Sequence, residues 1–221
     1  MTETVRSDFI SEMKEVEQDL LKMGSVVEQM LYTAVEALRE GNVVLAEEAV
    51  AMDDTVDHYN LAIESKCIGL LALQQPMARD LRTIAAALKI ITDIERMGDY
   101  VVDIAKTAIR LAEAPPFKWL ESISRMADLV KRMLRETLEA FVSRDLDLIQ
   151  RMIEHDDEVD RLDSALHGEL VSFMKQNPSL THQAMQLLMV ARYLERLADH
   201  VSNVGERVYY METGDLKELH A

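Results

Sequence analysis

The sequence contains few residues that end or bend a helix, with seven glycines and four prolines among 221 residues. Aromatic residues make up only 5% of the chain, whereas methionine occurs 14 times. Few turn-forming residues mean few turns and therefore long elements. Unbranched Leu and Met side chains suit helix–helix cores better than sheets, and no segment shows the alternation of a strand. The composition predicts an all-α protein.

Cysteine is nearly absent, since Cys67 is the single one. It excludes an internal disulfide and a cysteine-based zinc site. Cys67 shares a helical face with Ile63 and Leu70, so we expect a buried, inert thiol. The chain opens with no apolar leader, and no stretch approaches the roughly 20 apolar residues of a membrane span. We therefore expect a cytoplasmic protein that meets the membrane only indirectly, through partners.

Positive charge is also scarce, because 24 Lys and Arg oppose 40 Asp and Glu, for a formal net charge of −16. Nucleic acid and bare anionic membranes would repel such a chain. The balance instead favours cations, basic patches on partner proteins, or both.

One sequence unit occurs twice along the chain. The acidic stretch Asp53–Asp57 is matched about 100 residues later by Asp156–Asp160, and Glu95–Asp99 is matched by Glu195–Asp199. The landmarks occur in the same order in both halves, which indicates an internal repeat. The double proline at 115–116 is the clearest linker. We predict a first three-helix repeat over residues 1–114 and a second over residues 115–221.

Each unit has the apolar spacing of three helices. The predicted helices of the first unit span about 9–38, 43–74 and 77–112, with stops at Gly41, Asn42 and Pro76. Those of the second span about 117–143, 145–176 and 179–213. Short connections make consecutive helices antiparallel. The predicted architecture is two tandem antiparallel three-helix bundles with six long helices.

Acidic residues interrupt the apolar pattern at matched places. Glu95 falls within a predicted core seam that runs from Leu81 to Ile109, and Glu195 falls at the same place in the sixth helix. Like charges at i, i+4 destabilise a helix, and partly buried carboxylates cost more. Further residues at helical spacing extend the strips: Asp99 and Asp103, Asp199 and Asn203, and on the middle helices Asp53 and Asp57, Asp156 and Asp160.

Two interpretations of these strips stay open. A hard cation such as magnesium, manganese, calcium or iron would suit an all-oxygen site, and antiparallel helices could bring Asp53 and Asp57 toward Glu95. Alternatively, Arg96 and Arg196 lie beside the acids and could neutralise them without metal. His155, His167 and His200 could add a nitrogen ligand, although helix-surface histidines are the commoner case. The sequence contains no Glu-x-x-His pair, Gly-rich phosphate loop, EF-hand loop or HExxH.

Two long stretches resemble the PhoU family. The first runs from Gln75-Pro76-x-Ala78-x-Asp80-Leu81-Arg82 to Asp93-Ile94-Glu95-Arg96-Met97-Gly98-Asp99. The second, Ala191-Arg192-x-Leu194-Glu195-Arg196-Leu197-Ala198-Asp199-His200, is similar to the family's second copy. The resemblance covers about residues 8–215. It implies two three-helix bundles related by a pseudo-twofold axis.

The resemblance also implies metal clusters, for which iron, zinc, magnesium and manganese are known in the family. The metal is a divalent or trivalent ion, and its identity stays open. Asn203 adds no charge where the first unit has Asp103, so we expect the second site to hold metal more weakly. The implied ligands are Asp53, Asp57, Glu95, Asp99 and Asp103 in the first unit and Asp156, Asp160, Glu195, Asp199 and Asn203 in the second.

The function implied is regulation without catalysis. PhoU proteins repress the phosphate-starvation response and modulate phosphate uptake. They act as adaptors between the ATP-binding subunit of the Pst phosphate ABC transporter and the phosphate-sensing histidine kinase, and they commonly form homodimers. Two alternatives remain: a metal-dependent helical-bundle enzyme, such as a phosphatase or oxidase, or a purely structural bundle whose acids pair with arginines.

Overall fold

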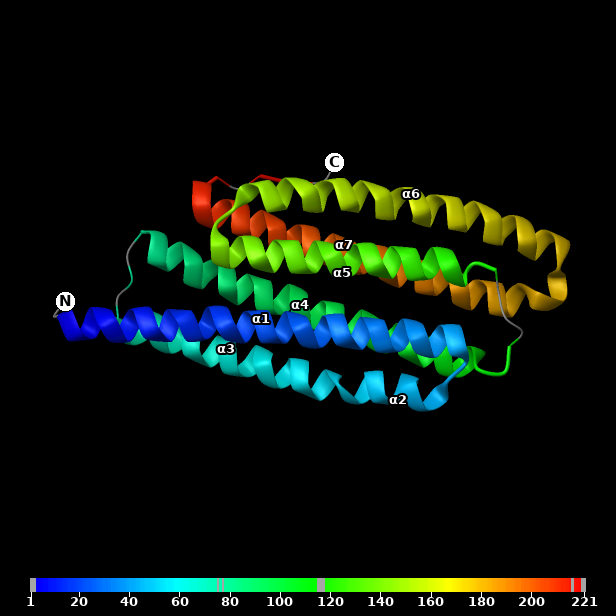
Figure 1. Ribbon diagram of the computed structural model, residues 1–221, viewed down its shortest axis with the longest axis horizontal. Coiled ribbons are helices and arrows are strands. Elements are labelled where there is room, and N and C mark those ends of the chain that lie inside the picture. The colour runs from blue at the N-terminus through cyan, green and yellow to red at the C-terminus, as the bar shows by residue number, and fades with distance from the viewer. Residues whose placement is uncertain (1–2, 75, 77, 115–117, 216, 220–221) are drawn as a thin grey trace.

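A computed structural model describes residues 3–74, 76, 78–114, 118–215 and 217–219 (Figure 1). Over these residues the chain is helical and contains no strand, which confirms the all-α prediction. The elements are α1 (Glu3–Glu40), α2 (Val43–Ala51), α3 (Asp53–Gln74), α4 (Arg79–Leu111), α5 (Leu120–Ser143), α6 (Leu146–Gln176), the 3₁₀ helix η1 (Pro178–Leu180) and α7 (Thr181–Thr213).

The helices form two antiparallel bundles that lie side by side (Figure 1). Helices α1 to α4 pack on one another, α5 to α7 do the same, and the most extensive packing of all joins α4 to α7. A second contact between the bundles joins α1 to α5. The predicted fold class is thus confirmed. The boundary between residues 114 and 115 stays a prediction, because Pro115 and Pro116 lie outside the described residues.

The turn between α1 and α2 shows why the predicted stop falls at Gly41. Its φ of +64° lies in the left-handed region, and a Cβ there would come within 2.9 Å of the carbonyl oxygen of Ala112. Asn42 then caps α2, because its side-chain oxygen accepts hydrogen bonds from the N–H groups of Val44 (3.1 Å) and Leu45 (3.3 Å).

Several predicted boundaries differ from the structure. The expected helix over 43–74 is divided at Met52, whose carbonyl accepts the N–H of Thr55 at 3.0 Å. Helix α1 begins at Glu3 rather than near Phe9, and η1 precedes α7. The predicted starts of the third and fourth helices, at residues 77 and 117, lie outside the described residues.

The buried face differs in part from the predicted seam. Leu81 is 45% exposed and so lies outside the core, whereas Ile94 and Val101 are fully buried. Cys67 is buried as expected, and burial raises the pKa of its thiol to about 12. Among the described helices, none is both long and apolar enough to span a membrane.

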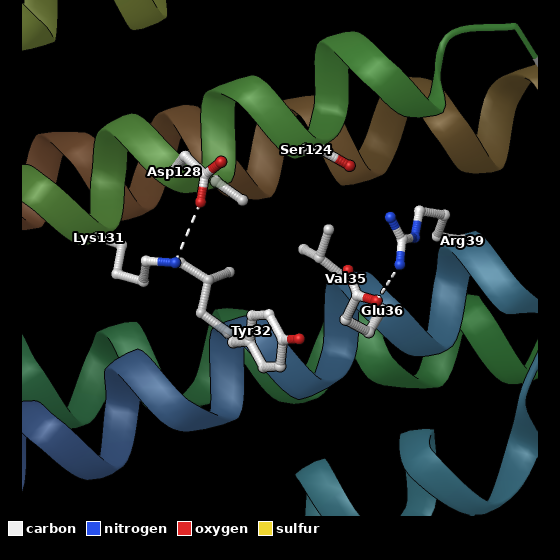
Figure 2. A pocket seen from close by; sticks show the side chains of 9 residues that line it. Tyr32, Val35, Glu36, Arg39, Ser124, Asp128 and Lys131 are labelled. Carbon is white, nitrogen blue, oxygen red and sulfur yellow. Dashed lines mark hydrogen bonds and ion pairs between the residues drawn. The ribbon is translucent and has the colours of Figure 1, made fainter.

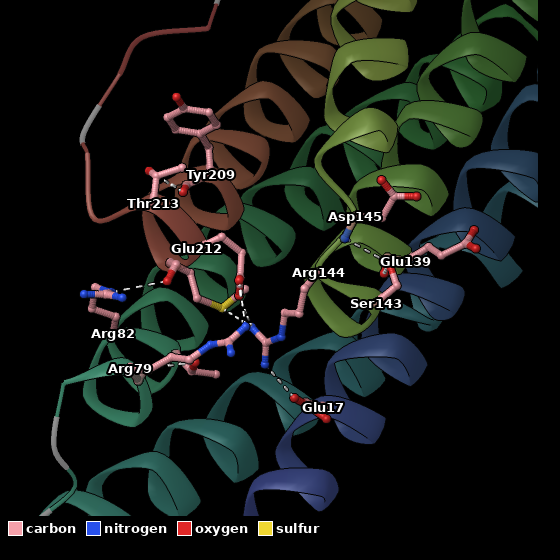
Figure 3. A network of polar contacts seen from close by, with 12 residues as sticks. Glu17, Arg79, Arg82, Glu139, Ser143, Arg144, Asp145, Tyr209, Glu212 and Thr213 are labelled. Atoms are coloured by element: carbon pink, nitrogen blue, oxygen red, sulfur yellow. Dashed lines mark hydrogen bonds and ion pairs between the residues drawn. The ribbon is translucent and has the colours of Figure 1, made fainter.

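A polar network joins the bundles at one end (Figure 3). Arg144, which ends α5 with a φ of +66°, donates to Glu17 of α1 at 2.9 Å and lies 3.6 Å from Glu212 of α7. Arg79 of α4 also donates to Glu212, at 2.7 Å. Four helices from both repeats are therefore tied together through these four side chains.

A small pocket marks the other contact between the bundles, between α1 and α5 (Figure 2). Lys131 bonds Asp128 at 3.0 Å and lies 5.6 Å from the ring centre of Tyr32. Arg39 pairs with Glu36 on α1. Each cation of this pocket thus has an acidic neighbour, so its lining carries no excess charge.

Candidate functional site

Four carboxylates of the first repeat meet across two helices. Asp53 opens α3 just after the interruption at Met52, and Asp57 follows one turn later. Burial raises the pKa of Asp53 to about 6, and repulsion from Asp57, Asp99 and Glu95 adds to the shift. The pKa of Glu95 is raised by burial and then by Asp99. The predicted convergence of Asp53 and Asp57 on Glu95 and Asp99 is therefore present.

Gly98 makes room for this acidic cluster. A Cβ at position 98 would lie 2.9 Å from Oδ1 of Asp53 and 3.5 Å from Cγ1 of Val56. Contacts below 3 Å force one partner to move, so Asp53 can approach α4 this closely only because residue 98 lacks a side chain. The matching residue of the second repeat is Ala198.

A second acidic cluster lies between α6 and α7. Burial raises the pKa of Asp160, with repulsion from Asp199 and Asp163 adding to it. The pKa of Glu195 is likewise raised by burial and then by Asp199. Asp163 is a member that the sequence analysis missed. Asp156, the counterpart of Asp53, is half-buried on α6.

Arginines contact both clusters, as the metal-free interpretation expected. Arg96 donates to Asp99 at 2.9 Å, and its Nε lies 3.6 Å from Glu95. Arg196 donates to Asp199 at 3.1 Å, and Arg192 pairs with Glu195. The pairs of Arg96 with Asp99 and of Arg196 with Asp199 are about half exposed, so each of these two contributes little to stability.

One carboxylate oxygen of the two acidic clusters has no hydrogen-bond donor among the described residues. Oε2 of Glu195 is buried and accepts no hydrogen bond within the part of the chain that the structure describes. Nε of Arg196 lies 3.9 Å from this oxygen. A buried acceptor without a donor is costly, which makes this oxygen a candidate metal ligand.

The residues fit a hard cation in donor type and in charge. Carboxylate oxygens are the ligands such ions prefer, and burial followed by repulsion from neighbouring carboxylates raises the pKa of Asp53 and of Glu195. As the side chains stand, no group of three or more His, Cys, Asp or Glu among the described residues is arranged to hold a metal. Coordination through both oxygens of Asp99 or Asp199 would require that carboxylate to leave Arg96 or Arg196. Metal binding therefore stays a prediction.

Two predicted ligands lie on a different strip, between α4 and α7. Asn203 donates to Asp93 of α4 at 3.4 Å, whereas Asp103 lies near Tyr193 of α7, whose pKa is raised by burial and then by this carboxylate. Eight residues along a helix turn a side chain by about 80°. Asp103 and Asn203 therefore face the opposite repeat rather than the cluster around Glu95 or Glu195.

The three candidate histidines occupy unlike positions. His200 lies 2.9 Å from Asp93 and close enough to Glu95 to act on its pKa, so it borders the first cluster from the second repeat. His155 lies 3.5 Å from Glu136, and His167 is exposed on α6. His200 is thus the one whose described contacts link it to a cluster.

The interface strip follows the internal symmetry. The pseudo-twofold operation relates each residue of α4 to the residue 100 positions later in α7. The contact of Asp93 with His200 therefore corresponds to the contact of Tyr193 with Tyr100, whose ring centres are 6.0 Å apart. Tyr100 and His200 also face each other, at 5.7 Å. The pseudo-twofold axis therefore passes between Tyr100 and His200.

Comparison with known proteins identifies the family to which the chain belongs. A family model described as the PhoU domain matches residues 20–108 and 123–208. A protein named phosphate-specific transport system accessory protein PhoU homolog from Clostridium acetobutylicum is 39% identical, covering 97% of this chain and 98% of its own. The protein of the same name from Aquifex aeolicus is 42% identical, covering 94% of each chain.

Solved structures agree with the sequence matches. The crystal structure of PhoU from Pseudomonas aeruginosa superposes with a TM-score of 0.89 at 33% identity, covering 94% of this chain and all of that one. The phosphate transport system regulatory protein PhoU from Streptococcus pneumoniae gives 0.88 at 32% identity, covering 95% of this chain and 99% of that one. This chain, with its two matched repeats and its duplicated acidic clusters, belongs to the PhoU family.

Proposed function

We propose that this protein is a regulator of phosphate transport that represses the phosphate-starvation response. The observation that carries the proposal is the match over nearly the whole chain to proteins named as accessory to the phosphate-specific transport system. Helical bundles of this kind supply long faces for other proteins. The role therefore needs docking surfaces and no catalysis.

Its proposed mode of action is that of a cytoplasmic adaptor. One partner would be the ATP-binding subunit of the Pst phosphate ABC transporter, and the other the phosphate-sensing histidine kinase. The net charge of −16 supports docking on basic patches of such partners. A homodimer would present each docking surface twice.

The acidic clusters are the proposed regulatory element. Iron, zinc, manganese or magnesium held by Asp53, Glu95 and their neighbours would neutralise charge that now repels. Cation binding would then couple the local electrostatic field to partner affinity. The second cluster, with Ala198 at the place of Gly98, would hold its ion more weakly.

An enzyme remains the alternative, and one feature argues for keeping it. The clusters concentrate carboxylates whose pKa values are raised, which is typical of sites that bind catalytic metals. A phosphatase or oxidase would also need an open coordination position beside a pocket. Assays of both activities on manganese- and iron-loaded protein separate the two proposals.

The regulator is tested in a bacterium that lacks its own copy and carries a reporter driven by a phosphate-starvation promoter. We expect this chain to silence the reporter in high phosphate. A Glu95→Gln/Glu195→Gln variant should fold, lose metal on elemental analysis and leave the reporter partly active. If the wild-type chain is expressed and folded but the reporter stays active, the regulatory proposal is wrong.

A further inference from the structure

The outer face of α2 and α3 carries a line of exposed residues spaced by seven. Its members are Glu47, Asp54, Leu61 and Ile68. Seven residues make nearly two helical turns, so Asp54, Leu61 and Ile68 lie on one face of α3, and Glu47 continues the spacing on α2, before the break at Met52. Leu61 is 65% and Ile68 54% exposed. Along α3 the line changes from acidic Asp54 to apolar Leu61 and Ile68, with exposed Glu64 beside the apolar pair.

Small residues flank the apolar half of the line on one side. Ser65 and Ala72 are exposed beside Leu61 and Ile68, and a Cβ added at Gly69 would meet no atom within 4 Å. A ridge of two large apolar side chains next to a shallow furrow of small ones is the surface on which another helix packs closely.

The second repeat lacks this apolar line. The matching positions on α6 are Gln150, Asp157, Ser164 and Val171. Helix α6 packs in its bundle as α3 does in the first. The fold therefore does not require leucine and isoleucine here, and burying these two side chains needs an occupant from outside the bundle.

No helix of the second repeat covers this face. Within the described residues, α2 and α3 contact α1 and α4 but none of α5, α6 and α7. Figure 1 shows α2 and α3 along the edge of the molecule that lies farthest from α6. The face is therefore accessible along its length.

We propose that this face docks a basic amphipathic helix of a partner protein. The helix would place apolar residues at heptad spacing on Leu61 and Ile68, and Lys or Arg residues on Glu47 and Asp54. Exposed Asp57 beside the line adds to the negative charge. Opposite charges at one end of the line would fix the direction in which the partner helix lies.

A second copy of this chain does not complement the face. Two copies packed antiparallel over the whole length of the line would set the carboxylates of one against Leu61 and Ile68 of the other, which desolvates charge without a counter-ion. Two copies packed parallel would set Glu47 and Asp54 against their own equivalents. The charge pattern thus selects a basic partner.

This inference deepens the proposed function, since an adaptor must dock other proteins, and it rests on that function only for the biological role of the partner. The test uses full-length protein and fluorescent synthetic helices of about 21 residues, or three heptads. Each helix carries leucines at heptad spacing in one half and Arg and Lys in the other. Two versions with the halves exchanged cover both directions.

We expect saturable binding of one version, measured by fluorescence anisotropy. A Leu61→Ser/Ile68→Ser variant should weaken it about tenfold or more, because two exposed apolar side chains no longer become buried. Glu47→Lys/Asp54→Lys should weaken it similarly, and more so at low salt. Val171→Ser, at the matching place on α6, is the control and should bind as the wild type does.

Three results would overturn the proposal. The first is that neither peptide version binds the wild-type protein. The second is that a scrambled peptide binds as tightly as the designed one. The third is that the Leu61→Ser/Ile68→Ser variant binds the peptide as tightly as the wild type does. A drop from dimer to monomer for that variant in sedimentation would show instead that a second copy covers the face. If peptide binding behaves as expected while the variant still silences the phosphate reporter, the docking face stands and its part in phosphate regulation fails.

Discussion

Oδ1 of Asp53 lies 2.9 Å from the point where a side chain on Gly98 would begin. We predict that Gly98→Ala leaves the protein folded, because the carboxylate end of Asp53 can rotate away and alanine favours a helix by about 1 kcal/mol. The same rotation should lower the affinity of the first cluster for Mn²⁺ about tenfold. Titration calorimetry of the metal-free protein measures this.

The matched control for that change is Gly168→Ala on α6, where a Cβ meets no atom within 4 Å. This substitution gives the same gain in helix propensity and should leave the affinity for Mn²⁺ unchanged. Equal affinities of Gly98→Ala and wild type would show that Asp53 does not hold the ion.

The raised pKa of Asp53 predicts how pH affects the metal-free protein. The folded chain holds this proton up to about pH 6, whereas the unfolded chain releases it near 3.8. The folded state therefore binds more protons in this window, so its contribution to stability falls as pH rises from about 4 to 6. Asp53→Asn should be more stable than wild type at pH 7 by on the order of 1 kcal/mol, since solvent screens a partly exposed group.

Urea unfolding with a chelator present, at pH 4.5 and pH 7, measures this difference. The advantage of Asp53→Asn should shrink at the lower pH, because wild-type Asp53 is then protonated too. An advantage that is equal at both pH values would mean that neither burial nor the neighbouring acids raise the pKa of Asp53 in the folded protein.

Arginine and a metal ion compete for the same carboxylates. Arg96 donates to Asp99 at 2.9 Å, so Arg96→Gln should free this carboxylate and strengthen Mn²⁺ binding several-fold by removing a positive charge. The unfolding free energy should fall by less than about 1 kcal/mol, because the ion pair is exposed. Competition with a chelator measures the affinity for Mn²⁺, and urea unfolding measures the unfolding free energy.

Arg39→Gln serves as the comparison, since Arg39 pairs with Glu36 away from both clusters. If Arg96→Gln destabilises the chain and metal affinity does not rise, the acids of the first cluster act as partners of arginine and not as ligands.

Arg144 contacts both repeats, and its replacement should lower the free energy of unfolding. Its guanidinium is held by Glu17 and Glu212, each only about one-fifth exposed. Arg144→Ala should therefore cost roughly 1–3 kcal/mol, because Glu17 loses the hydrogen bond from Arg144 and Glu212 keeps only Arg79 as a neighbouring cation. Arg144→Gly should cost about 1 kcal/mol less, since glycine adopts the φ of +66° without strain.

Thermal unfolding by calorimetry compares these two variants. Equal losses would mean that position 144 contributes no backbone strain. Unchanged stability in both would mean that the bundles are held by their apolar contacts alone.

The fold was largely predictable because one unit occurs twice. Landmarks such as Glu95 and Glu195 align the halves, and Gly41 and Asn42 end a helix by local chemistry that the sequence displays. The break at Met52 was not predictable, since no glycine or proline accompanies it. Leu81 was misplaced because an apolar residue at helical spacing is also compatible with the exposed edge of a bundle.

The site was predictable to the extent that helix geometry is short-range. Asp53 and Glu95 were paired from their matched positions in antiparallel helices. Asp103 was grouped with Glu95 although a side chain eight residues on has turned toward α7. Asp163 was missed because its counterpart in the first repeat is Asn60, so comparing the repeats gave no signal.

The contacts across the pseudo-twofold axis have a consequence for how such a chain can be assembled. Two copies of the first repeat would bring Asp93 against Tyr100 twice, and two copies of the second would bring Tyr193 against His200 twice. Only one copy of each gives an acid beside a histidine at one place and two neighbouring tyrosine rings, tilted by 32°, at the other. Because the two repeats are covalently linked, they can differ in sequence and still pair, and two copies of either repeat would not reproduce these contacts.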